Sequence, residues 1–253
     1  MSVFGNYARY YDLLYRDKDY GGEAEYIAGL IERFAPDADT ILELGCGTGK
    51  HAELLARRGY ALLCMDRSLT MLDRARERIA SLEQGERIEV REGDVRDFSL
   101  GRRFDAVISL FHVVSYVTAN ADVRSLLRCV REHLNPGGVF VFDVWYGPAV
   151  LTLKPEVRVL RLEDEAIDVT RIAEPDLHIN ENVVDVNYEI LVRDKRSGAL
   201  ERHEETHRMR YAFRPELDLL LDEAGLKLVH GEEWMTGRAP GADTWGVCFV
   251  AKG

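Results

Sequence analysis

Apolar, strand-like segments alternate with amphipathic, helix-like segments along the first 146 residues, and this alternation limits the fold more than any other feature. RFDAVISLF at 103–111 is almost continuously apolar, which is typical of a strand buried on both faces of a parallel sheet. The segments between the strands carry apolar residues at helical spacing. We therefore expect an α/β fold with a Rossmann-like, doubly wound sheet. Its seven strands are expected at 40–45, 61–66, 87–94, 103–111, 139–145, 227–234 and 246–252.

A period of two residues replaces this pattern between about 156 and 213. In VVDVNYEILV, Val184 and Val186 fall on one face of a strand, whereas Asp185 and Asn187 fall on the other. Such alternation is typical of an antiparallel sheet with one wet face. We therefore divide the chain into an N-terminal lid and helix at 1–35, a core at 36–146 and 214–253, and an antiparallel β insertion at 147–213 that contributes to the substrate site.

The charge and the cysteines argue against several classes of function. The formal net charge is −11 and no long basic run is present, so a nucleic-acid partner is not expected. The four cysteines form no CxxC pair and indicate reduced thiols in a cytoplasmic protein. The sequence contains neither a run of transmembrane length nor a signal-peptide core, so no membrane association is expected. The expected partner is a small molecule, and a homodimer is an open alternative to a monomer.

One apparent metal motif occurs in the wrong context. His203-Glu-Glu-Thr-His207 fits HExxH, which binds zinc only on a helix, where both histidines share one face. The neighbouring residues alternate like a strand, which would place the two imidazoles about 13 Å apart. No metal site is therefore expected. Most arginines of the insertion are expected on solvated strand faces, although some could bind a diphosphate. These arginines include Arg158, Arg161, Arg171, Arg193, Arg202, Arg208 and Arg210.

A glycine-rich turn follows the first strand and opens a helix. Its sequence is Glu43-Leu-Gly45-Cys46-Gly47-Thr48-Gly49. Glycines let the backbone approach a ligand closely, and the helix N-terminus favours negative charge there. The spacing G-x-G-x-G differs from the G-x-G-x-x-G fingerprint of NAD-binding proteins. The turn therefore indicates a ligand site, with a ligand-free βα turn as the plain alternative.

Two carboxylates follow the next strands. Asp66 ends the second strand, where an acidic side chain can accept hydrogen bonds from both ribose hydroxyls of a nucleoside. Asp94, in Gly93-Asp94-Val95, follows the third strand and could accept from an adenine amino group. The alternatives are a carboxylate at a helix N-terminus for Asp66, although Ser68 is the better cap, and an ordinary turn aspartate for Asp94.

Five signals stand in the order found in one enzyme family: ELGCGTG at 43–49, Asp66, GDVRDF at 93–98, FDAVISLF at 104–111 and LNPGG at 134–138. From about 38 to 145 the chain therefore resembles the class I S-adenosylmethionine (SAM)-dependent methyltransferases. YYDLLYRDKDYGGEAEYI at 10–27 and GRRFDAVISLFHVVSYV at 101–117 look like the matching segments of N,N-dimethyltransferases that act on TDP-linked amino sugars of macrolide biosynthesis. Glycine N-methyltransferase-type enzymes have a related architecture.

The resemblance implies a role for several residues. Gly45, Cys46, Gly47 and the backbone of Leu110 would lie along the methionine part of SAM, and Tyr20 would reach its carboxylate. The ribose would be held by Asp66 with Arg67 beside it, and the adenine by Asp94 and Val95. Tyr11 and Tyr15 would lie on a lid over the substrate. The product of the cofactor would be S-adenosylhomocysteine.

The chemistry asks for alignment more than for acid–base catalysis. A methyl sulfonium is already electrophilic, so the protein must line up the nucleophile, methyl and sulfur. An amine needs only to arrive neutral, whereas a hydroxyl needs a base within reach. His112, just after the fourth strand, is the first candidate for a base and Tyr15 the second. Trp145 and Tyr146 could stack on a substrate ring, or pack between the core and the insertion.

Several functions fit these features. The favoured one is methylation of the amine of a nucleotide-linked amino sugar or a similar metabolite. O-methylation of a small molecule and glycine-type N-methylation are the alternatives within the family. Two further alternatives are a SAM-binding module without catalysis and an NAD-dependent oxidoreductase, against which the G-x-G-x-G spacing argues.

Overall fold

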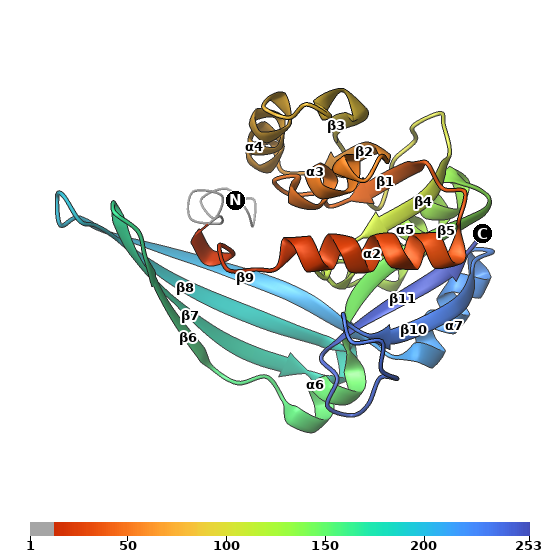
Figure 1. The fold of residues 1–253 in the computed structure, drawn as a ribbon. Coiled ribbons are helices and arrows are strands. Elements are labelled where there is room, and N and C mark those ends of the chain that lie inside the picture. The colour runs from red at the N-terminus through yellow and green to blue at the C-terminus, as the bar shows by residue number, and fades with distance from the viewer. Residues whose placement is uncertain (1–12) are drawn as a thin grey trace.

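The computed structural model describes residues 13–253 and has a seven-stranded sheet at its centre (Figure 1). The strands lie in the order β3-β2-β1-β4-β5-β11-β10, with β1 to β5 parallel and β11 antiparallel to both neighbours. These strands are β1 (Thr40–Leu44), β2 (Ala61–Asp66), β3 (Ile88–Glu92), β4 (Phe104–Ser109), β5 (Leu134–Tyr146), β10 (Lys227–Glu233) and β11 (Gly246–Lys252). The expected α/β sheet of seven strands is confirmed.

Helices cover both faces of this sheet. They are α2 (Tyr20–Phe34), α3 (Lys50–Arg57), α4 (Leu69–Ala80), α5 (Asn120–His133) and α7 (Arg214–Glu223). Helix α6 (Gly147–Leu153) packs on the insertion instead, and η2 (Val113–Tyr116) is a short 3₁₀ helix after β4. Ile41 packs with α2, α3 and α4, whereas the next residue, Leu42, packs with α5 and α7. Both are fully buried, which explains why the strands are apolar on both faces. No helix within residues 13–253 combines the length and the apolar character needed to span a membrane.

The ends of the helices follow local chemistry. Ser68 caps α4 by accepting a hydrogen bond from Met71 N at 3.4 Å, and Asp19 caps α2 by accepting from Gly22 N at 2.9 Å. Helix α5 ends at His133, just before the NPGG segment at 135–138, which already belongs to strand β5. Helix α6, with Pro148 in its first turn, is an element that the sequence pattern did not predict.

The insertion forms an antiparallel sheet in the order β9-β8-β7-β6, whose hairpins project away from the core (Figure 1). Its strands are β6 (Arg158–Glu163), β7 (Ile167–His178), β8 (Val183–Asp194) and β9 (Leu200–Ala212). β9 returns to the core and pairs in parallel with the end of β5, with Trp145 opposite Tyr211. The core sheet and the insertion are therefore one continuous sheet.

A small apolar cluster joins three parts of the chain. Leu13, Leu14 and Tyr15 pack against Met71 of helix α4 and against the buried face of strands β7 and β8. The contributing residues of those strands are Ile167, Val169, Ile190 and Val192. The N-terminal segment thus lies between the core and the insertion, over the carboxyl ends of the parallel strands.

Candidate functional site

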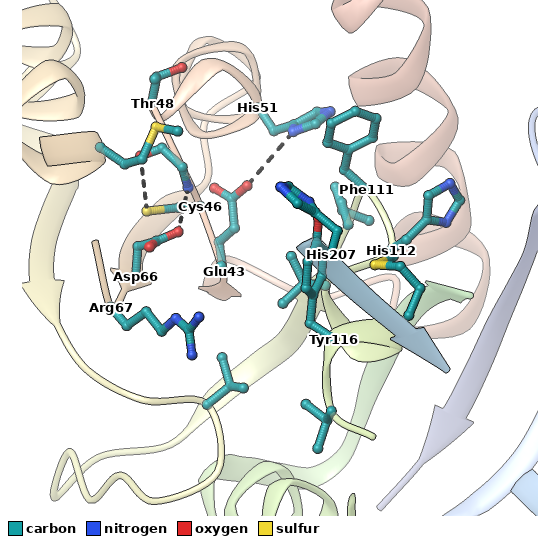
Figure 2. A pocket seen from close by; sticks show the side chains of 18 of the residues that line it. Glu43, Cys46, Thr48, His51, Asp66, Arg67, Phe111, His112, Tyr116 and His207 are labelled. Atoms are coloured by element: carbon teal, nitrogen blue, oxygen red, sulfur yellow. Dashed lines mark hydrogen bonds and ion pairs between the residues drawn. The ribbon is translucent and has the colours of Figure 1, made fainter. Parts of the chain in front are cut away.

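One pocket gathers most of the residues that the sequence singles out (Figure 2). It lies at the carboxyl ends of β1, β2 and β4, where open α/β sheets bind their ligands. Its lining includes the expected residues Tyr15, Tyr20, Gly45, Cys46, Gly47, Asp66, Arg67, Asp94, Val95, Leu110, His112 and Trp145. Strands β8 and β9 of the insertion close the opposite wall.

Three glycines of the loop have left-handed backbone conformations. Gly45, Gly47 and Gly49 have φ angles of 75°, 54° and 72°, which L-residues rarely adopt. A Cβ at Gly45 would lie 2.6 Å from methyl carbons of Val113, whereas a Cβ at Gly47 would meet nothing within 4 Å. Only glycine fits the first position, and the second faces open space. The loop is therefore shaped for the close approach of a ligand to its backbone.

Asp66 is tied to the glycine loop. Its carboxylate accepts hydrogen bonds from Gly47 N at 3.0 Å and from Ser68 N at 2.8 Å. Burial raises the pKa of Asp66 above its usual value, against the effect of these two backbone donors. A carboxylate has about four lone-pair positions, so acceptor capacity remains for hydroxyl groups of a ligand.

The carboxylate of Asp94 accepts hydrogen bonds from the neighbouring Arg96. Both of its oxygens accept from the guanidinium of Arg96, from Nε at 2.9 Å and from Nη2 at 2.6 Å. These bonds hold the pKa of Asp94 below its usual range. Asp94 is thus a fixed carboxylate at the pocket rim, and the partly buried Val95 packs beside it against the core.

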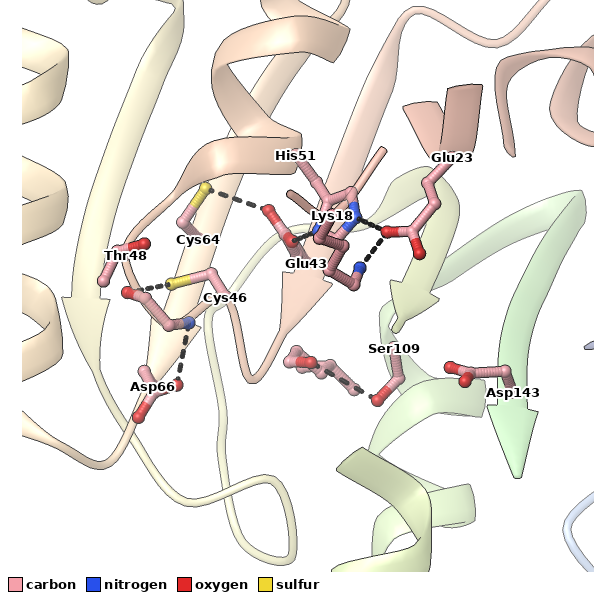
Figure 3. Close-up of polar contacts among 12 residues, drawn as sticks. Lys18, Glu23, Glu43, Cys46, Thr48, His51, Cys64, Asp66, Ser109 and Asp143 are labelled. Atoms are coloured by element: carbon pink, nitrogen blue, oxygen red, sulfur yellow. Dashed lines mark hydrogen bonds and ion pairs between the residues drawn. The ribbon is translucent and has the colours of Figure 1, made fainter. Parts of the chain in front are cut away.

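Beyond the glycine loop, a buried polar chain connects helix α2 to strand β1 (Figure 3). Glu23 pairs with Lys18 and lies 2.8 Å from His51 Nε2, and His51 Nδ1 lies 3.8 Å from Glu43. Complete burial raises the pKa of Glu43 to about 8. Although burial opposes it, bonding to His51 and Lys18 holds the pKa of Glu23 below its usual value.

Two cations flank the ring of Tyr20 at this end of the pocket. Lys18 Nζ lies 4.3 Å and Lys50 Nζ 4.7 Å from the ring centroid. Lys18 is already paired with Glu23, whereas Lys50 lines the pocket and places a positive charge that suits a carboxylate ligand beside Tyr20.

His112 is held by a buried aspartate that the sequence analysis did not single out. Its Nδ1 lies 2.7 Å from Asp143 Oδ2, and its backbone N–H donates to the same carboxylate at 3.1 Å. The signal for Asp143 was present, because a charged residue inside the apolar strand VFVFDVW needs a partner. Phe111 and His112 both have left-handed backbones, with φ of 64° and 61°.

The opposite end of the pocket is lined by aromatic and insertion residues. Tyr15 meets the ring of Phe111 edge-on at 5.0 Å, and Trp145 meets His112 at 6.3 Å. Tyr116 and four insertion residues complete this wall: Val186, Tyr188, His207 and Met209. Strand alternation shows which face is buried but not what that face meets, so these residues could not be identified as a group from the sequence.

One of the expected substrate residues, Tyr146, is described but does not line the pocket. Tyr146 follows Trp145 on the same strand, so its side chain points to the other face, where it packs against the core. The expected stacking role of Tyr146 is thus not supported by its position. Tyr11 lies outside the described residues.

The apparent HExxH motif lies on strand β9, as its alternating neighbours predicted. His203 is next to Glu201 near the turn that joins β8 to β9, whereas His207 contacts Tyr116 in the pocket. Within residues 13–253, no group of three His, Cys, Asp or Glu side chains is arranged to hold a metal ion.

The pocket fits SAM in three respects. The glycine loop leaves space at Gly47, Asp66 offers acceptors for a ribose, and Lys50 beside Tyr20 suits the carboxylate of an amino acid. When bound, SAM supplies a methyl group on a sulfonium, ready for transfer to a nucleophile.

Comparisons with known proteins agree with this arrangement. A family model described as a methyltransferase domain matches residues 41–138. The chain is 31% identical over 251 residues to a dTDP-3-amino-3,6-dideoxy-alpha-D-glucopyranose N,N-dimethyltransferase of Streptomyces fradiae, a match that covers 98% of this chain and 93% of the relative. A second relative is the dTDP-3-amino-3,4,6-trideoxy-alpha-D-glucopyranose N,N-dimethyltransferase of Streptomyces venezuelae. The chain is 39% identical to it over 147 residues, a match that covers 56% of this chain and only 59% of the relative.

Solved structures extend the similarity to the whole fold. The crystal structure of Streptomyces venezuelae DesVI superposes with a TM-score of 0.81 at 28% identity and 97% coverage of both chains. SAM-bound CalS10, an amino pentose methyltransferase from Micromonospora echinaspora, superposes with a TM-score of 0.75 at 27% identity, covering 100% of this chain and 97% of its own. The relative matched over nearly its full length establishes the family, and this chain is accordingly a class I SAM-dependent methyltransferase, related to the TDP-amino-sugar N,N-dimethyltransferases.

Proposed function

We propose that this enzyme transfers the methyl group of SAM to the amine of a nucleotide-linked amino sugar. The observation that carries the proposal is the match to the Streptomyces fradiae enzyme, because it runs through the insertion as well as through the SAM-binding core. Three curated relatives are named as N,N-dimethyltransferases of dTDP-linked amino sugars. A wall of aromatic and polar side chains opposite the glycine loop supports an acceptor with both a ring and polar groups.

The proposal assigns the glycine-loop end of the pocket to the cofactor. Gly45, Cys46, Gly47 and Leu110 line the methionine part, and Tyr20, between Lys18 and Lys50, binds the carboxylate. Asp66 with Arg67 holds the ribose, and Asp94 with Val95 holds the adenine. Support comes from the shared pocket, the open space at Gly47 and the acceptor capacity that remains on Asp66.

The proposal assigns the other end to the acceptor. His112 Nδ1 lies 2.7 Å from Asp143 Oδ2, and the imidazole is assigned the role of taking a proton from an ammonium group of the acceptor. The amine, once neutral, attacks the methyl carbon in line with the bond to sulfur. Tyr15 covers the acceptor from the lid, and Trp145 packs against it. The division into a lid at 1–35, a core at 36–146 and 214–253 and an insertion at 147–213 belongs to the same proposal.

The test is a turnover assay of the purified protein with SAM. The acceptors are dTDP-3-amino-3,6-dideoxyglucose, its analogue with a hydroxyl in place of the amine, and glycine. We expect mass spectrometry to detect a sugar nucleotide carrying one or two added methyl groups, formed only from the amine. Methylation of the hydroxyl analogue or of glycine instead would establish one of the alternative acceptors and refute the proposal.

A further inference from the structure

Lys18, in the segment that precedes helix α2, has no part in the methyl transfer described above, although it contacts several parts of the site (Figure 3). Its ammonium group pairs with Glu23 of helix α2 and lies 4.3 Å from the ring centroid of Tyr20. It also lies 4.4 Å from the ring centroid of Phe111, which follows strand β4 and lines the pocket. One side chain thus contacts both helix α2 and the turn that carries His112.

The ammonium group of Lys18 is held in a fixed place. The side chain is only 14% exposed, and burial lowers the pKa of Lys18 below its usual value, against the effect of Glu23. A buried cation needs an anionic partner, and the carboxylate of Glu23 is itself fixed by His51, whose Nε2 lies 2.8 Å away. The cation is therefore anchored on the cofactor side of the pocket, from where it reaches the ring of Phe111.

The turn at Phe111 and His112 needs support at both residues, because each has a left-handed backbone. Asp143 holds His112 through its backbone N–H and its imidazole. The ring of Phe111 is contacted from the N-terminal segment, by Tyr15 edge-on at 5.0 Å and by the ammonium group of Lys18. The conformation of this turn thus depends on where the segment 13–19 lies.

We propose that Lys18 is a positioning residue that couples the N-terminal segment to the turn of Phe111 and His112. While the segment lies over the pocket, the cation holds the ring of Phe111 and thereby aligns the imidazole of His112 with the amine of the acceptor. The inference rests on the proposed function and deepens it, because it makes the alignment of the base depend on the segment that covers the acceptor.

The first test is a double-mutant cycle on turnover with SAM and dTDP-3-amino-3,6-dideoxyglucose. Lys18→Met keeps the length of the side chain but removes the cation, and Phe111→Leu keeps the apolar character but removes the ring. We expect each variant to lower kcat about tenfold, and the double variant to lower it no further. The KM for SAM should change by less than about threefold. Independent losses that multiply to about a hundredfold would overturn the coupling.

Two further variants separate the contact from a general effect on folding. Lys18→Arg keeps a cation over the ring of Phe111 and should recover most of kcat. Lys195→Met removes a lysine of the insertion that pairs with Glu163 and Asp168, and it should leave kcat unchanged. A loss in Lys18→Arg as large as that in Lys18→Met would overturn the role of the cation.

The second test needs no acceptor. Coupling is reciprocal, so the loss of either partner should loosen the N-terminal segment. In the complex with S-adenosylhomocysteine, Lys18→Met and Phe111→Leu should each speed tryptic cleavage after Arg16 by at least about threefold, measured by mass spectrometry of the released peptide. Phe34→Leu is the matched control, because it removes a ring 4.9 Å from the guanidinium of Arg33 at the far end of helix α2. It should leave the cleavage rate unchanged.

The two tests distinguish this inference from the proposed function. If the wild type methylates the amine but cleavage after Arg16 is unchanged in both variants, the coupling is overturned while the amino-sugar function stands. If the wild type does not methylate the amine, the proposed function is refuted, and the cleavage rates still decide whether Lys18 and Phe111 link the segment to the turn.

Discussion

Phe111 and His112 have left-handed backbones although neither is glycine, a conformation that costs of order 1 kcal/mol or more at each residue. This cost is offset by the buried Asp143, whose carboxylate accepts a hydrogen bond from the backbone N–H of His112 and contacts its imidazole. One carboxylate thus fixes both the main chain and the ring of His112. At this scale the site consists of functional groups whose orientation depends on a buried partner.

Replacing the imidazole tests its proposed role as a base. His112→Ala should lower kcat by about 10²- to 10⁴-fold, the usual contribution of general-base catalysis, and leave the affinity for SAM nearly unchanged. Turnover assays and calorimetric titration with SAM measure the two effects. His178→Ala, at a histidine on β7 that pairs with Asp185 outside the pocket, is the matched control. Wild-type turnover in His112→Ala would make His112 a passive wall residue.

Removal of the carboxylate that is proposed to hold the ribose should change the affinity for SAM. Asp66→Ala should weaken SAM binding about tenfold to a hundredfold, because it removes a hydrogen-bond acceptor and releases Gly47 N–H from its partner. Titration calorimetry provides the measurement. Asp73→Ala removes an exposed carboxylate of helix α4 that pairs with Arg76 and should have no effect. An unchanged affinity in Asp66→Ala would remove Asp66 from the SAM site.

Glu43 makes stability depend on pH. Its pKa is about 8 in the folded protein against 4.5 for the free side chain, so the folded protein keeps a proton that the unfolded chain loses. Between about pH 4.5 and pH 8, this group therefore lowers the unfolding free energy by about 1.4 kcal/mol per pH unit. Glu43→Gln cannot ionise, so its melting temperature should exceed that of the wild type by an increasing amount from pH 5 to pH 8. A difference that is constant across this range would contradict a buried, protonated Glu43.

At the scale of secondary structure, the sequence predicted elements with a strong period and clear ends almost to the residue. β2 and β11 have the expected limits, because each is a continuous apolar run that begins or ends at a charged residue or a glycine. Helix α6 was missed because it has only seven residues, too few to show a period.

The site was predictable where chemistry follows a local motif and not where it depends on long-range pairing. Gly45, Gly47 and Asp66 follow consecutive strands of one sheet, so order along the chain implies proximity. His207 meets Tyr116 across 91 residues, and only the return of β9 to the end of β5 brings them together. As a residue of an apparent zinc motif, His207 was considered only as a metal ligand.

The cap of helix α2 gives a prediction for a single element. Asp19 accepts from Gly22 N at 2.9 Å, so Asp19→Ala should lower the unfolding free energy by about 1 kcal/mol. Urea denaturation followed by circular dichroism measures the change. Asp19→Ser retains a capping oxygen and should recover most of the loss. Equal losses in both variants would show that Asp19 acts through something other than capping.

For the whole molecule, the cluster of Leu13, Leu14 and Tyr15 with Met71 and the insertion strands links parts that are distant in sequence. We expect unfolding to be one cooperative transition. Ile190→Ala, at a fully buried position of this cluster, should lower the unfolding free energy by about 2–5 kcal/mol. Leu200→Ala, at a mostly exposed position, should change it by less than about 0.5 kcal/mol. Separate melting of the insertion, seen as transitions that differ between tryptophan fluorescence and circular dichroism, would refute this linkage.

The parallel pairing of β9 with β5 restricts how acceptor specificity could be engineered by recombination. A graft of the insertion from a relative would bring in a new β9, whose Tyr211 and Ala212 must still align with Trp145 and Tyr146 of the host. Crossover points placed before Trp145 and after Ala212 would transfer both halves of this pairing together. A chimera with one crossover point between Trp145 and Ala212 would pair the β5 of one protein with the β9 of the other. The insertion residues that line the pocket would then lie out of register with the host strands.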